Sequence, residues 1–254
     1  MGSPPSAIEA AEPKLAQDSA PPDLAAWVAT MDKAANERKL NTLLKQYERD
    51  FVHSDGLTRA QMKKAIRNFW QQYDQLTYTT RIDSWEMPEP GVYTTQTTTT
   101  ISGRQTQGKP QPKSLQTTLV SQQTIQNSRI IRQATLSEKT MVTSGSNPPK
   151  VQVNLPESVR AGEEYYFDVI VDEPLGNRIL LGAALEETVD PQGHLQPAQF
   201  ELESLSTGGL FKVGKAPETA QDEWISAILI QDGGMLVVSQ RLSVEPRSSA
   251  KSNP

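Results

Sequence analysis

The chain has 254 residues, of which 36% are hydrophobic and 22% charged, and its formal net charge is −5. A chain of this length usually folds into two domains, and its apolar content suits two modest cores better than one large core. It contains no cysteine, which excludes disulfides, thiol catalysis and cysteine-ligated metal sites. No apolar run reaches the roughly 18 residues that a membrane-spanning helix needs.

The charge is distributed unevenly along the chain. Residues 1–148 carry 17 basic and 14 acidic side chains, a net charge of +3, whereas residues 150–245 carry 6 basic and 16 acidic ones, a net charge of −10. The asymmetry predicts either attraction between two domains or two different partners, and ordinary solvated surface explains it equally well. Because no basic stripe alternates with aromatic residues, we expect no nucleic-acid partner.

The first 22 residues are rich in alanine, proline and small polar residues and show no apolar period. Such a segment buries too little surface to offset its chain entropy, so residues 1–22 are predicted to be a disordered tether and residues 246–254 a disordered tail. Tethers of this kind commonly follow the lipid-bearing cysteine of bacterial lipoproteins, and Gly2-Ser3-Pro4 resembles the residues after that cysteine, with Met1 in its place. The alternatives are a cytosolic protein with a floppy start and a Gly-Ser remnant of cloning.

Apolar residues at helical spacing predict three helices in the segment that follows the tether. Asp23 is expected to cap the first helix, and Thr58 with Gln61 predicts a capping box at the start of the third. Residues 50–56, between the second and third helices, are too short and too rich in turn formers to be helical. The apolar positions are Leu24, Trp27, Val28 and Met31, then Leu40, Leu43, Leu44 and Tyr47, then Met62, Ile66, Phe69, Trp70 and Tyr73.

Beyond Gln75 the helical period is lost, and segments rich in Thr, Val, Ile and Tyr predict a meander of antiparallel strands. In the first segment Leu76, Tyr78, Thr80 and Ile82 alternate with more polar residues. We therefore expect a sheet with one polar and one apolar face, and three helices that cover only the apolar face. The four segments are residues 76–85, 92–101, 114–125 and 129–141.

This order of elements resembles the nuclear transport factor 2-like (SnoaL-like) superfamily, which implies a cone-shaped α+β domain at residues 23–145. The chain is most similar to exported cyanobacterial members, which carry an extra C-terminal β-domain and have no assigned activity. The fold hosts dehydratases, isomerases, ligand carriers and interaction domains, so the resemblance implies a fold rather than one function. The segments that carry it are Leu44-Lys45-Gln46-Tyr47, Asp50-Phe51-Val52-His53, Leu57-Thr58-Arg59-Ala60-Gln61, Trp70-Gln71-Gln72-Tyr73 and Leu76-Thr77-Tyr78.

A second domain is predicted at residues 150–245, after a short rigid linker at residues 146–149. Its first two strands, around Val151-Gln152-Val153 and Tyr165-Tyr166-Phe167, look like the opening of bacterial immunoglobulin-like modules. Asp232-Gly233 predicts a tight hairpin, and about seven short strands in roughly 95 residues suit a β-sandwich. The predicted fold class is therefore α+β, a cone-shaped domain followed by an all-β immunoglobulin-like sandwich.

Residues with catalytic chemistry are few. The chain has two histidines, His53 at the end of a short strand and His194 in a loop of the other predicted domain, and we expect the two not to meet. A lone histidine is more often a surface or capping residue than a general base. Since metal-binding spacings and glycine-rich phosphate loops are also absent from the sequence, we expect no catalytic residue, no metal and no cofactor.

Six residues are candidates for lining a ligand pocket inside the cone. Asp83 is the carboxylate candidate, although its phase with Arg81 on the polar side of the strand favours a solvated charge. Large residues at helical or strand spacing usually belong to the core, and this is the favoured explanation for most of the aromatic candidates. The six are Trp70, Tyr73, Tyr78, Tyr93, Asp83 and His53.

Two functions compete on these observations. The favoured one is a non-catalytic exported scaffolding protein, an assembly or accessory factor that engages a protein partner through the Thr-rich run at residues 94–100 or through the groove between the domains. The family resemblance implies that this partner belongs to a membrane complex. The alternative is a small-molecule carrier or a cavity-based enzyme of the isomerase or dehydratase type. A pocket of a few hundred cubic ångströms with convergent polar groups favours the alternative. The resemblance also implies that a homodimer can form through the open sheet.

We predict that the protein is exported to the periplasm or thylakoid lumen and held at a membrane face by an N-terminal lipid anchor. The full-length gene tests this expectation. An apolar segment that ends in a cysteine is expected directly before Gly2, and a gene that starts at Met1 contradicts it.

Overall fold

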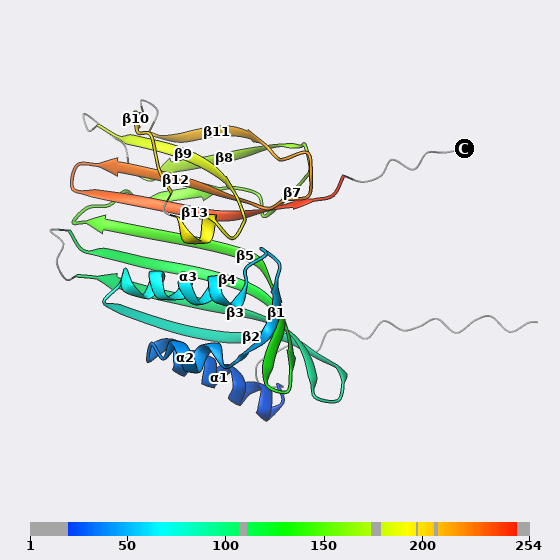
Figure 1. Ribbon diagram of the computed structural model, residues 1–254. Helices are drawn as coiled ribbons and strands as arrows, with labels where there is room; N and C mark the ends of the chain where they lie inside the picture. Colours follow the sequence, from blue (N-terminus) through cyan, green and yellow to red (C-terminus); the bar gives the residue numbers. More distant parts are fainter. Residues whose placement is uncertain (1–19, 107–110, 174–178, 197, 206–207, 248–254) are drawn as a thin grey trace, which may run out of the picture.

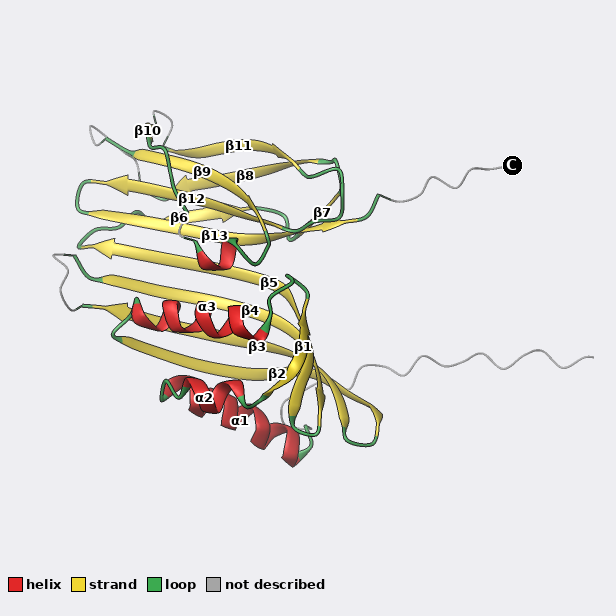
Figure 2. Ribbon diagram, in the orientation of Figure 1, coloured by secondary structure: helices red, strands yellow, loops and turns green. Residues whose placement is uncertain are grey.

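The computed structural model describes residues 20–106, 111–173, 179–196, 198–205 and 208–247. Within these residues the chain is an α+β protein with three α-helices, one large, mostly antiparallel sheet and one three-stranded sheet (Figures 1 and 2). The predicted tether and tail fall almost entirely outside the described residues. No helix in the described ranges has the length and apolar composition of a membrane span.

The three predicted helices are present, and the start of the third has the predicted cap. The Thr58 hydroxyl accepts a hydrogen bond from the Gln61 amide, and the Gln61 side chain accepts one from the Thr58 amide, which completes the capping box. The predicted cap at Asp23 is wrong, because the first helix already begins at Pro22, whose ring presets the backbone angle of a first turn. The helices are α1 (Pro22–Asn36), α2 (Leu40–Leu44) and α3 (Arg59–Gln71).

Strands from both halves of the chain build the large sheet, in the order β10-β9-β12-β13-β5-β4-β3-β2. Two short strands extend it by parallel pairing, β1 on β5 and β7 on β13. Tyr47, predicted to end the second helix, instead begins β1. The strands are β1 (Tyr47–His53), β2 (Gln75–Glu89), β3 (Val92–Gln105), β4 (Lys113–Gln126), β5 (Arg129–Gly145), β7 (Ser158–Arg160), β9 (Leu181–Thr188), β10 (Glu203–Ser204), β12 (Glu223–Gln231) and β13 (Gly234–Glu245).

The junction between the two halves is a strand pairing. β13 pairs antiparallel with β5, from Gly234 opposite Gly145 to Gln240 opposite Lys139, so one sheet runs through both halves. The predicted linker lies against the hairpin between β12 and β13, since the Asn147 amide donates to the Gly233 carbonyl (2.9 Å). The two halves are therefore joined by a hydrogen-bonded ladder in addition to the covalent chain.

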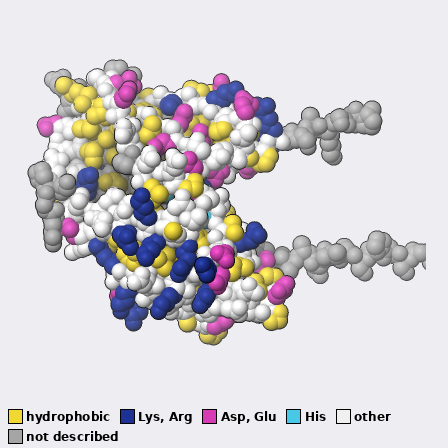
Figure 3. Space-filling view, viewed as in Figure 1, with side chains coloured by type: hydrophobic (Ala, Val, Ile, Leu, Met, Phe, Trp, Pro, Cys, Tyr) yellow, Lys and Arg dark blue, Asp and Glu magenta, His cyan; other side chains and the backbone are white. Residues whose placement is uncertain are grey.

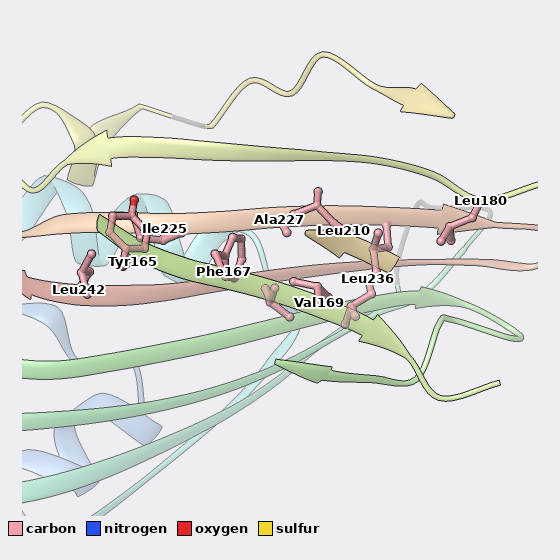
Figure 4. Close-up of a cluster of buried hydrophobic side chains, with 11 residues drawn as sticks. Tyr165, Phe167, Val169, Leu180, Leu210, Ile225, Ala227, Leu236 and Leu242 are labelled. Carbon is pink, nitrogen blue, oxygen red and sulfur yellow. The ribbon is translucent and has the colours of Figure 1, made fainter. Parts of the chain in front are cut away.

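The small sheet packs against one face of the large sheet, over strands from the C-terminal half of the chain. Buried side chains of β8, among them Phe167 and Val169, point toward Ile225 on β12 and Leu236 on β13 (Figure 4). Burying these side chains supplies the hydrophobic stabilisation of this half of the protein. The small sheet has the order β11-β8-β6, with β6 (Val151–Asn154), β8 (Glu164–Val171) and β11 (Gly209–Lys215).

The opposite face of the large sheet lies beneath the helices. In Figure 1, α3 and the short 3-10 helix η2 (Gly193–Leu195) lie in front of this face, one over each half of the sheet. Figure 3 shows Lys and Arg side chains gathered over the half that carries the helices, as the uneven charge of the sequence predicts.

The prediction that the helices cover an apolar face is wrong. As predicted, Tyr78, Thr80 and Ile82 lie on the inner side of their strand. The covered face nevertheless also buries hydroxyl groups, and Thr97 is only 1% exposed. Several of these groups pair across strands; the Thr117 and Thr140 hydroxyls are 3.0 Å apart.

The β5–β13 junction yields a prediction about Gly145. Its φ is +91°, and a Cβ atom there would meet the Gly233 carbonyl, whereas Gly91 has a similar φ of +77° and open space around it. Gly91→Ala is expected to cost about 1 kcal/mol, for the left-handed backbone alone. Gly145→Ala adds a backbone clash and is expected to lower the free energy of unfolding, measured in urea, by about 3 kcal/mol. Equal losses in the two variants would show that the junction absorbs the clash.

Candidate functional site

A cavity of about 580 Å³ lies between the helices and the large sheet. Its volume falls within the range of roughly 300–1,000 Å³ that is typical of small-molecule sites. The first half of the chain contributes α1, α3 and β2 to β5, and the second half contributes β9, β12, β13 and the segment around η2. The second half thus completes a cavity that the sequence placed within the first half alone.

The two walls of the cavity differ in chemistry. The helix wall is apolar, and the sheet wall is lined largely by hydroxyl groups with a few apolar side chains such as Leu119. Such a cavity suits a molecule with one apolar side and one side that carries oxygen atoms. The helix wall includes Trp27, Met31, Met62, Ile66, Phe69 and Trp70, and the sheet wall Thr97, Thr99, Thr117, Thr140, Ser226 and Ser239.

Hydroxyl pairs on neighbouring strands leave donors available on the sheet wall. Thr117 lies opposite Thr140 (3.0 Å between the oxygens), and Ser226 lies opposite Ser239 (2.9 Å). Each pair has two hydroxyl protons and uses one of them internally. The second proton of each pair can therefore be donated to a ligand oxygen.

The charges at the cavity are acidic. Asp32, Glu138 and Glu187 line it, and no Lys or Arg does so among the described residues. Asp32 accepts hydrogen bonds from the Thr80 amide and hydroxyl (2.7 Å each), and Glu138 accepts one from the Trp224 indole (3.1 Å). An anionic ligand would lack a counter-charge here, so the cavity disfavours anionic ligands.

A buried ion pair lies next to the cavity, at the junction of the two halves. The Arg241 guanidinium donates to both oxygens of Asp55 (2.6 and 3.1 Å), and both side chains are only 2% exposed. Arg241 also donates to Asp222 (3.1 Å). Burial acts to raise the pKa of Asp55, but hydrogen bonds from His194 and Arg241 and the Arg241 charge outweigh it and hold the pKa well below its usual range.

His194 fixes η2 to this ion pair. Its Nε2 atom lies 2.8 Å from the Asp55 carboxylate, and its ring packs edge-on against Trp224, with 4.7 Å between ring centroids. The prediction that the two histidines do not meet is wrong, since the rings of His53 and His194 are 6.3 Å apart. The β5–β13 pairing brings the two halves together, and with them the histidines.

His53 is buried and lines the cavity. Its Nδ1 atom accepts a hydrogen bond from the Asp55 backbone amide (3.1 Å), so in the neutral ring the proton sits on Nε2. Burial lowers the pKa of His53 below its ordinary value, although the Asp55 charge opposes this shift. His53 is therefore a neutral hydrogen-bond donor near pH 7.

The structure brings three of the six predicted pocket residues together. Trp70, Tyr78 and His53 line the cavity, and the Trp70 indole donates to the Tyr78 hydroxyl (2.8 Å). Burial raises the pKa of Tyr78 to about 12, so its hydroxyl stays protonated.

The other three candidates lie elsewhere. Tyr73 belongs to a neighbouring core cluster, and the Tyr93 hydroxyl donates to Asp23 at the start of α1 (2.9 Å). Asp83 forms an ion pair with the exposed Arg81 (2.7 Å) and accepts a hydrogen bond from Thr98.

Sequence reasoning missed Asp55, Gln133, Trp224 and Arg241. No clear local signal marked Arg241, because its strand also carries Ser239, Gln240 and Ser243. Once buried, an arginine requires an acidic partner. The identity of that partner is not encoded locally, because Asp55 is 186 residues away in the sequence.

Comparison with known proteins gives a match in the second half of the chain. A family described as a domain of unknown function (DUF8623) matches residues 146–245, which contain His194, Trp224 and Arg241. Comparison with curated proteins finds no match. Within the described residues, no group of three or more His, Asp or Glu side chains is arranged to hold a metal ion.

The buried ion pair yields a prediction about stability. Arg241→Met leaves the Asp55 carboxylate buried without its counter-charge. The free energy of unfolding, measured in urea, is therefore expected to fall by about 3–5 kcal/mol. Arg81→Met is the matched control, because Arg81 pairs with Asp83 at the surface, with 64% of its side chain exposed, and is expected to lose less than about 1 kcal/mol. Similar losses in the two variants would contradict a special role for the junction pair.

The pKa shifts predict two acid-dependent losses of stability. The folded state lowers the pKa of His53, so the unfolded chain binds the extra proton and stability falls as the pH drops below the ordinary histidine value of about 6.5. The lowered pKa of Asp55 adds a second loss below the ordinary aspartate value of about 3.9. Unfolding midpoints measured between neutral pH and acid test this, and His53→Gln is expected to remove only the first loss. An unchanged pH profile in that variant would contradict the assignment.

Proposed function

We propose that this protein is a non-catalytic carrier of an uncharged, largely apolar small molecule that bears oxygen atoms along one side. The observation that supports this most is the cavity of about 580 Å³, with its apolar helix wall and hydroxyl-rich sheet wall. Sites of this size with a few convergent polar groups are typical of small-molecule binding.

The state of the acidic groups supports binding over catalysis. A general base needs an available carboxylate or imidazole poised for proton transfer. Asp32 is held by Thr80, Glu138 by Trp224 and the neighbouring Asp55 by Arg241, whereas Glu187 lines the cavity without such a hydrogen bond among the described residues. These hydrogen bonds hold the three carboxylates in position, which favours a fixed structural role for them.

We infer that residues 23–145 have the nuclear transport factor 2-like fold and residues 150–245 an immunoglobulin-like sandwich. Helices over one face of an antiparallel sheet support the first assignment, and β11-β8-β6 packed against the far end of the large sheet supports the second. In this arrangement the sandwich closes one side of the cone, and export with an N-terminal lipid anchor would place the carrier beside a membrane that supplies its ligand.

A scaffolding function is the second candidate. Tyr166, Phe211 and Val213 are each more than half exposed on the outer face of the small sheet, and grouped apolar side chains are typical of protein contacts. Under this candidate, Phe211→Glu is expected to release a membrane-complex protein that co-purifies with the wild type, without affecting ligand binding in the cavity.

The carrier function predicts saturable binding of a neutral, environment-sensitive dye such as Nile red. Leu119→Trp fills the cavity from the sheet wall and is expected to lower the affinity for the dye about tenfold or more. Leu136→Trp is the matched control, since Leu136 is 43% exposed and its replacement should change the affinity less than about twofold. Fluorescence titration measures both. Absence of saturable binding, or equal binding by the Leu119→Trp protein, would contradict the carrier function.

A further inference from the structure

We propose that His53 and Gln133 form a polar anchor in the cavity that binds a hydroxyl group of the ligand, with His53 donating to the hydroxyl oxygen and Gln133 accepting its proton. The inference rests on the proposed carrier function and narrows the ligand to an apolar alcohol. It follows from the hydrogen-bonding state of two neighbouring side chains.

His53 supplies the donor. The Asp55 amide occupies its Nδ1 atom, which leaves Nε2 as the protonated nitrogen, and the ring lines the cavity. Among the described residues, no protein atom accepts a hydrogen bond from Nε2. The junction holds the ring in place, because Asp55 is itself fixed by Arg241 and His194.

Gln133 supplies the acceptor. Its side chain lines the same cavity, and its Oε1 atom has no hydrogen-bond partner among the described residues. This oxygen is closed to the cavity as it stands, so binding includes a rotation of the Gln133 amide that turns Oε1 toward the ligand. A buried amide oxygen without a partner is costly, and an unexplained one is a reason to look for a ligand. Gln133 is the register partner of His53 between β1 and β5, and the Ser54 amide bonds to the Gln133 carbonyl (2.9 Å). The two side chains therefore lie next to each other on a fixed backbone.

A donor beside an acceptor selects the ligand group. A hydroxyl accepts from His53 and donates to Gln133 through a single atom, whereas an ether or ketone oxygen accepts from His53 and leaves Gln133 without a donor. A carboxylate or phosphate would bring a negative charge to a cavity whose charged residues are acidic. The anchor thus discriminates an alcohol from its ether of nearly equal size.

The experiment measures displacement of Nile red by farnesol and by farnesyl methyl ether. The wild type is expected to bind the alcohol about tenfold more tightly than the ether, since the ether leaves a buried acceptor unsatisfied. Gln133→Leu is expected to reduce this preference below about threefold, because Gln133 is the acceptor that only the alcohol satisfies. His53→Phe is expected to weaken both ligands and to keep the preference, because both oxygens accept from His53. Gln122→Leu makes the same change as Gln133→Leu on the exposed face of the neighbouring strand and should retain the full preference.

The outcomes separate the anchor from the carrier function. Equal displacement of the dye by the alcohol and the ether in the wild type overturns the anchor while the carrier function stands. Failure of the dye and both ligands to bind overturns the carrier function and the anchor with it. Thermal melting confirms that each variant is folded, and the comparison of two ligands on the wild type is independent of any variant. If Gln122→Leu loses the preference for the alcohol as fully as Gln133→Leu does, the anchor is also overturned.

Discussion

The antiparallel ladder between β5 and β13 is the interaction on which the other features of this protein depend. It joins the last strand of the helix-covered half to the last strand of the half that carries the small sheet, so that one sheet runs through both halves. Because side chains alternate along a strand, the ladder fixes which residues of β12 and β13 face the helices: Trp224 and Arg241 on one side, Ile225 and Leu242 on the other. A slip of one residue would exchange these two sets and place Arg241 in the apolar core.

The ion pair of Asp55 and Arg241 specifies this arrangement more than it stabilises it. Removing two charges from water costs as much free energy as their attraction returns, so such pairs add little net stability while strongly opposing any arrangement that separates them. Here the pair links the loop after β1 to the centre of β13, and His194 adds the segment that covers the cavity. Three segments that are distant in the sequence are thereby held in one geometry.

The cavity stays open because its two walls carry different kinds of side chain. Large aromatic and branched side chains hold the helices away from the sheet, and the sheet wall satisfies its hydroxyl groups by cross-strand pairs such as Thr117 with Thr140. A sheet wall made only of large apolar side chains would favour collapse of the helices onto it, because apolar surfaces gain free energy by closing gaps. A hydroxyl-lined wall tolerates an open space and offers hydrogen bonds to whatever enters it.

The sequence by itself determined the local elements: three helices, the capping box at Thr58, and the hairpin at Asp232-Gly233. These features depend on residues a few positions apart, whose periodicity is visible in the chain. Sequence also identified Trp70, Tyr78 and His53 as pocket candidates, since they are large or polar residues at the inner positions of their elements. Only the tertiary structure decided that the threonine-rich strands line a cavity and that His53 meets His194. Both follow from the register between β5 and β13, which depends on the packing of whole faces and leaves no periodic signal in either segment.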